Sequence, residues 1–127
     1  MAEIVVHDAF EIPHYDGPHS IPGIRFRPAR STLGVSAWGM NVLEIDAGCT
    51  GYLEHAHAHA HDDQAEVYVV LRGAAVLHAD GAIYPVTAGA MVRVPPAVKR
   101  TFTTESGVVL LALGATPGVA YSPSPGM

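Results

Sequence analysis

The sequence has little cysteine, little charge and no long apolar run, and each shortage excludes a class of protein. Cys49 is the only cysteine in the 127 residues, so no internal disulfide can form, which is typical of a reducing compartment. No run reaches the ~18 consecutive apolar residues that a membrane span needs. The first ten residues also lack the basic and apolar regions of a signal peptide. We therefore expect a cytoplasmic protein without a membrane partner.

The charge distribution excludes a second class of partner. Asp, Glu, Lys and Arg together make up 15% of the chain, and the net charge is −5 with histidine neutral. No basic run exists, so the electrostatic footprint of a nucleic-acid-binding protein is missing. Apolar residues make up 49%, which is enough for one well-filled core. We predict a single domain over residues 1–127.

Glycine and proline divide the chain into short apolar segments. The 13 glycines and 10 prolines separate runs that are rich in valine, leucine and isoleucine, which predicts many strands and hardly any helix. The expected strands are residues 3–7, 23–27, 33–45, 52–61, 66–72, 74–79, 82–86, 90–94, 99–103 and 108–113. The dipeptide Asp80-Gly81 predicts a tight type I′ hairpin. So many short strands in one domain predict a sandwich or barrel, and residues 115–127 are expected to form an exposed C-terminal tail.

Four histidines alternate with alanine in one short stretch. On a strand, alternate side chains share a face, so His55, His57, His59 and His61 would form a stripe of imidazoles. A turn after this run would carry Glu66 onto the neighbouring strand, where its carboxylate could join them. Two or three imidazoles with one carboxylate suit Zn, Fe(II), Ni, Mn or Cu. The alternative is a solvated, low-complexity strand without a bound ion, and the spacing does not decide between the two.

The same stretch resembles the first motif of the cupin superfamily, which is broadly G(x)5HxH(x)3–4E(x)6G. Here His59-Ala-His61 is followed by four residues and Glu66, and six further residues lead to Gly73. Residues 81–100 resemble the second motif in part. The wider stretch is similar to small bacterial cupin-domain proteins of unassigned function. The resemblance implies an all-β, double-stranded β-helix (a jelly-roll or cupin barrel) with its motifs over residues 33–114, a divalent metal in the barrel mouth, and a homodimer.

The resemblance leaves the choice of histidine ligands open. Counting back from Glu66 selects His59 and His61, whereas counting forward from the start of the motif selects His55 and His57. An intermediate register selects His57 and His59. The predicted metal ligands are therefore two or three of these four histidines together with Glu66.

Arg100 occupies the position at which the cupin pattern has its last histidine ligand, and Thr104 occupies the asparagine position. Arginine cannot bind a metal as a neutral donor. The site therefore has three ligands, recruits an extra histidine, or has lost its metal. If Arg100 shares an inward face with Phe102, its guanidinium needs an anion, which would be Glu66 or a carboxylate or phosphate of a ligand. The alternative is an exposed arginine at the barrel mouth.

Two aromatic positions have a packing and a binding interpretation. Tyr68 shares strand parity with Glu66 and could offer its phenol to a ligand, although packing with a hydrogen-bonded tip is the commoner role. Trp38, Met40 and Val42 alternate on one expected strand, and we predict packing for them.

Three function hypotheses follow. The first is a metal-dependent enzyme on a small organic molecule, dioxygenase- or isomerase-like, in which the ion acts as a Lewis acid or activates O2. The second is a non-catalytic module that binds a metal or small ligand, which the replacement of the last histidine by Arg100 favours. The third is a metal-free interaction domain with a pH-sensitive histidine surface.

Overall fold

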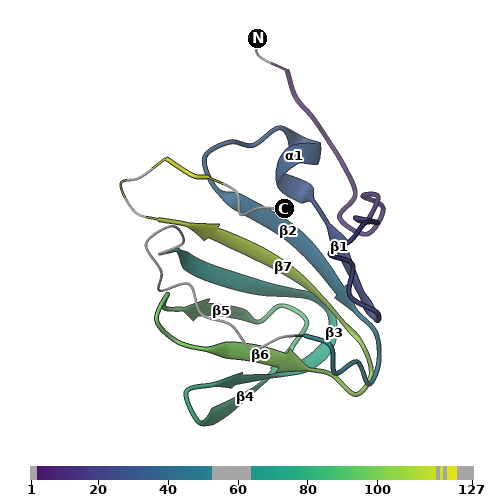
Figure 1. The fold of residues 1–127 in the computed structure, drawn as a ribbon, viewed down its shortest axis with the longest axis vertical. Coiled ribbons are helices and arrows are strands. Elements are labelled where there is room, and N and C mark those ends of the chain that lie inside the picture. Colours follow the sequence, from purple (N-terminus) through teal and green to yellow (C-terminus); the bar gives the residue numbers. More distant parts are fainter. Residues whose placement is uncertain (1–2, 53–63, 117, 119, 123–127) are drawn as a thin grey trace.

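The computed structural model describes residues 3–52, 64–116, 118 and 120–122. Within these residues it has seven strands and one short helix (Figure 1). The elements are β1 (Ile24–Arg27), α1 (Ala29–Leu33), β2 (Gly39–Ile45), β3 (Ala65–Ala79), β4 (Ala82–Thr87), β5 (Met91–Val94), β6 (Arg100–Thr103) and β7 (Val108–Ala115). The predicted all-β jelly roll is confirmed.

The long strand β3 belongs to both halves of the β-structure. Its first part lies between β7 and β5, and its second part lies between β6 and β4, all in antiparallel pairs. Beyond β7 the order continues through β2 to β1, as Figure 1 shows. Gly73 lies where β3 passes from one set of partners to the other, with φ +83°, and a Cβ there would collide with the carbonyl oxygen of Gly107. The two strands expected at 66–72 and 74–79 are therefore one strand.

Alternation along the strands separates an inner from an outer apolar layer. The inner layer is lined by buried side chains of β2, β3, β6 and β7, among them Ile45, Leu77, Phe102 and Leu110. A smaller outer cluster consists of Ile12, Ala29, Val42 and Val109. Ala29 of α1 and Ile12, which lies before β1, therefore cover the outer face of β2 and β7. Inward-facing residues of β3 and β6 consequently meet inside the barrel.

The turn between β3 and β4 has the expected geometry. Asp80 has φ +53° and Gly81 has φ +77°, which are the two positive values that a type I′ turn requires. The hairpin prediction is confirmed.

Three local predictions are wrong, two of them about strands and one about the packing of Trp38. Residues 3–7 form no strand, since no described segment of this chain pairs with them, and Ile4 and Val6 are 91% and 84% exposed. The expected strand 33–45 begins only at Gly39, because α1 continues to Leu33 and ends at the left-handed Gly34. Trp38 therefore precedes β2 and is 44% exposed instead of packed.

The expected strand 52–61 lies, apart from Tyr52, outside the described residues. No helix in the described part of the chain is long and apolar enough to cross a membrane.

Candidate functional site

The structure brings three of the predicted site residues together inside the barrel. Glu66 and Tyr68 come from β3, and Arg100 comes from the first position of β6. The remaining predicted ligands lie outside the described residues, so their roles and register stay predictions; they are His55, His57, His59 and His61.

Arg100 points into the barrel. Along β6 the buried residues Arg100 and Phe102 alternate with the more exposed Thr101 and Thr103, and Arg100 itself is 0% exposed. Its Nη2 donates to the carbonyl oxygen of Pro95 at 2.8 Å. The structure therefore shows the inward orientation of Arg100, which is the orientation that requires an anion near the guanidinium.

Glu66 and Tyr68 form a hydrogen-bonded pair beside this guanidinium. The Tyr68 hydroxyl donates a short hydrogen bond to Glu66 Oε1, and the same oxygen lies 3.9 Å from Arg100 Nη1. Gly114 is the ladder partner of Glu66 on β7. A Cβ at Gly114 would lie 2.7 Å from Gln64 Oε1 and 3.7 Å from Glu66 Oε2. The glycine thus leaves space for both side chains on the inner face.

Aromatic rings surround the polar groups. The Phe102 ring makes edge contacts with Tyr68, at 4.9 Å between centroids, and with Tyr52, at 5.8 Å. Burial raises the pKa of both tyrosines well above the ordinary value, and the Glu66 charge raises it further. Both phenols therefore keep their protons at neutral pH and can act as donors.

Sequence reasoning missed two residues of this site. Gln64 is 8% exposed and has the same strand parity as Glu66 and Tyr68, so extending the alternation by one step would have found it. Tyr52 precedes the histidine run, and no local signal indicated that it would lie beside β6, where its carbonyl oxygen accepts from Thr101 and its ring contacts Phe102.

The described residues provide one metal ligand of the expected kind. No group of three or more His, Cys, Asp or Glu side chains that could hold an ion occurs among residues 3–52, 64–116, 118 and 120–122. This ligand is Glu66, whose Oε1 accepts from Tyr68 and faces the Arg100 guanidinium. A carboxylate oxygen of this kind fits a site completed by imidazoles. Arg100 cannot be a ligand, because a guanidinium has no lone pair to donate.

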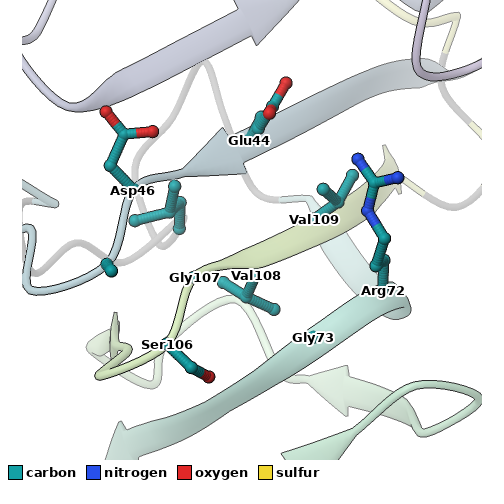
Figure 2. A pocket seen from close by; sticks show the side chains of 10 residues that line it. Glu44, Asp46, Arg72, Gly73, Ser106, Gly107, Val108 and Val109 are labelled. Atoms are coloured by element: carbon teal, nitrogen blue, oxygen red, sulfur yellow. The ribbon is translucent and has the colours of Figure 1, made fainter.

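A separate depression of roughly 350 Å³ is lined by residues 44–47, 72–73 and 106–109 and contains none of the predicted site residues. Figure 2 shows the carboxylates of Glu44 and Asp46 on one side of it and the Arg72 side chain on the other. Both Glu44 oxygens accept hydrogen bonds, from Arg25 and Arg27, which lower the pKa of that carboxyl to about 2. Arg25 also pairs with Asp46, and Arg72 stacks over the Phe10 ring, so the charged groups at the depression already have protein partners.

Solved structures resemble this fold at low sequence identity. One is a sugar phosphate isomerase from Silicibacter pomeroyi, which is described as a member of a cupin superfamily. It has a TM-score of 0.62 and 22% identity, and the match covers 75% of this chain and 61% of that protein. Another is a predicted oxalate decarboxylase from Thermotoga maritima, with a TM-score of 0.66, 17% identity and coverage of 87% and 97%. A third is a Cupin 2 conserved barrel domain protein from Salinispora arenicola, with a TM-score of 0.66, 19% identity and coverage of 92% and 91%. Likeness at these identities shows the fold alone.

A family model decides the relationship. No curated protein matches the chain. The model of the cupin domain matches residues 47–114, a stretch that holds Glu66 and Tyr68 on β3, Arg100 on β6 and most of β7. The chain belongs to the cupin family.

Proposed function

We propose that this cupin barrel binds a divalent transition metal (Zn, Ni, Fe or Mn) and takes a small organic molecule beside the ion. The proposed metal ligands are Glu66 with two or three of the histidines His55, His57, His59 and His61. The observation that supports this most is the position of Glu66, whose side chain is 12% exposed and faces the barrel interior on the strand that follows the histidine run.

The first candidate activity is enzymatic. A bound divalent ion would supply Lewis-acid or O2-activating chemistry, as dioxygenase- or isomerase-like reactions use. Tyr68 orients the Glu66 carboxylate by donating to Oε1, in the way that outer hydrogen bonds orient metal ligands. Arg100 supplies a buried positive charge beside it. Two proteins of similar structure, a sugar phosphate isomerase and a predicted oxalate decarboxylase, have names that agree with a small organic substrate.

A non-catalytic metal- or ligand-binding module is the second candidate. Arg100 favours it, because this residue removes the last histidine ligand of the cupin pattern and places a cation near the ion. Redox-active iron with O2 uptake on a candidate substrate would favour the enzyme. Tight Ni or Zn binding without an open coordination position would favour the module.

We also propose a homodimer in the cytoplasm. Ile4 and Val6 are 91% and 84% exposed on a segment that has no strand partner in the described part of the chain, and a second copy would remove them from water. The doubly substituted variant Ile4→Ser/Val6→Ser should then elute as a monomer in size-exclusion chromatography with light scattering. A wild-type monomer at micromolar concentration would contradict the dimer.

Elemental analysis of untagged protein tests the metal proposal. We expect about one ion per chain, reduced in His57→Ala and in Glu66→Gln. His78→Ala is the matched control, because His78 on β3 is not a proposed ligand. Its Nε2 makes a 2.8 Å hydrogen bond with Thr103 Oγ1 on β6. Metal content that is unchanged in Glu66→Gln would mean that the histidine run binds ions adventitiously, and metal-free wild type would leave the pH-sensitive interaction domain.

A further inference from the structure

The Arg100 guanidinium has hydrogen-bond donors that the described residues do not satisfy. Its Nη2 bonds to the carbonyl oxygens of Pro95 and Val94, at 2.8 and 3.4 Å. Its Nε and Nη1 are buried and have no hydrogen-bond partner within the described part of the chain. Buried donors without acceptors are costly, most of all on a charged group, so this arrangement calls for an acceptor that the described residues do not provide.

Glu66 does not fill that role. The separation of 3.9 Å between Arg100 Nη1 and Glu66 Oε1 exceeds a hydrogen bond, and Oε1 already accepts the Tyr68 proton. Glu66 therefore balances the charge of Arg100 without saturating its donors.

The charge balance changes if Glu66 binds a metal, and the inference rests on the proposed function at this step. Without metal, the charges of Arg100 and Glu66 cancel. With a divalent ion the sum is one from Arg100 plus two from the ion minus one from Glu66, so the interior carries two positive charges and favours an anion.

We propose that Arg100 anchors the carboxylate of a small organic acid through Nη1, and that a metal ion on Glu66 strengthens this binding. A guanidinium donates well to a planar carboxylate. Phe102 shares the inward face of Arg100 on β6 and packs against the rings of Tyr52 and Tyr68, so apolar groups adjoin this charge. Phosphate fits less well, because it needs more donors than Nε and Nη1 supply and the Tyr68 proton is already given to Glu66.

Thermodynamic linkage makes the effect reciprocal. If metal tightens carboxylate binding, the carboxylate must tighten metal binding by the same factor, and we expect about fivefold or more. A carboxylate bound elsewhere on the protein would not show this coupling.

Calorimetric titration of acetate into metal-free and zinc-loaded protein tests the inference. In wild type we expect binding that zinc tightens, with inorganic phosphate and the neutral isostere acetamide both much weaker. In Arg100→Met the acetate affinity should fall roughly tenfold or more, because a buried charged donor is lost. The matched control is Arg93→Met, which removes the same charge from an exposed position on β5 and should stay within about twofold of wild type.

The outcomes separate this inference from the metal proposal. If none of Zn, Ni, Fe and Mn binds, the metal proposal fails, and acetate binding to metal-free protein that is lost in Arg100→Met still supports the anchor. Undiminished affinity in folded Arg100→Met, phosphate binding as tight as acetate, or no acetate binding to wild type in either form overturns it. Equal affinity with and without bound zinc overturns the coupling. Should Arg100→Met not fold, the Nε–H resonance of Arg100 in 15N-labelled wild type decides, since acetate must shift it.

Discussion

Removing both Arg100 and Glu66 should destabilise the metal-free protein much less than the sum of the two single removals. The perturbations are Arg100→Met, Glu66→Gln and the double substitution. Arg100 is 0% exposed and the Glu66 side chain 12% exposed, and the two opposite charges lie 3.9 Å apart. Removing one leaves the other as a buried charge without this counter-charge.

The separation of the two groups sets the magnitude. At 3.9 Å and an effective dielectric constant of about 20, the Coulomb attraction is about 4 kcal/mol. Loss of one partner of a buried pair costs about 3–5 kcal/mol, and the partial exposure of Glu66 moves the expectation to the lower end. We expect about 3 kcal/mol for each single substitution and about 3–4 kcal/mol for the double one, which leaves a coupling of about 2–3 kcal/mol.

Urea denaturation with a chelator present, followed by circular dichroism, measures the four free energies of unfolding. The cycle of Glu66→Gln with Arg93→Met is the control and should be additive, because Arg93 is exposed on β5. A coupling below about 0.5 kcal/mol between Arg100 and Glu66 would refute the reasoning, since independent sites give that value. The interior would then screen the pair as water does.

Three further predictions concern stability. Tyr68→Phe should lower the free energy of unfolding by about 1.5–3 kcal/mol, because it removes a donor to a charged carboxylate; Tyr84→Phe, at a 51% exposed ring, is the control and should change nothing measurable. The pKa of Glu44 falls from its ordinary 4.5 to about 2, so its contribution is present above pH 4.5 and is lost as the pH falls toward 2. Between pH 4.5 and 2 the free energy of unfolding should therefore fall by about 1 kcal/mol less in Glu44→Gln than in wild type, after allowance for solvent screening. An identical pH profile in the two proteins would contradict the pairing. Gly73→Ala should cost more than about 2 kcal/mol in thermal or urea unfolding, because φ is +83° and the Cβ meets backbone; a neutral effect would mean that β3 can shift there.

Much of the fold could be predicted from local patterns. Alternating apolar residues identified most of the strands, and Asp80-Gly81 identified the turn after β3, because both signals act over a few residues. The continuity of β3 through Gly73 could not be predicted this way. Glycine usually ends a strand, and here the close approach of Gly107 from the turn before β7 is what requires it.

The errors have a common physical cause. Residues 3–7 have strand-like composition, but a strand needs a partner, and the described chain offers none. Trp38 has the alternation of a packed residue, but α1 ends at Leu33 and β2 begins at Gly39, which leaves the ring outside the sheet. In both cases the local sequence is typical of a strand, but the neighbouring segments that a strand or a packed ring needs are not there in the described structure.

Within the candidate site, the sequence by itself determined which side chains share a face. The two-residue period of a strand puts Glu66 with Tyr68, and Arg100 with Phe102, whatever the rest of the chain does. Only the tertiary structure decided that these two faces meet. Pairing of β3 with β6 and β7 brings the guanidinium to 3.9 Å from the carboxylate and leaves Nε and Nη1 without a partner in the described chain. Distances between side chains on different strands depend on long-range packing, which no local pattern encodes.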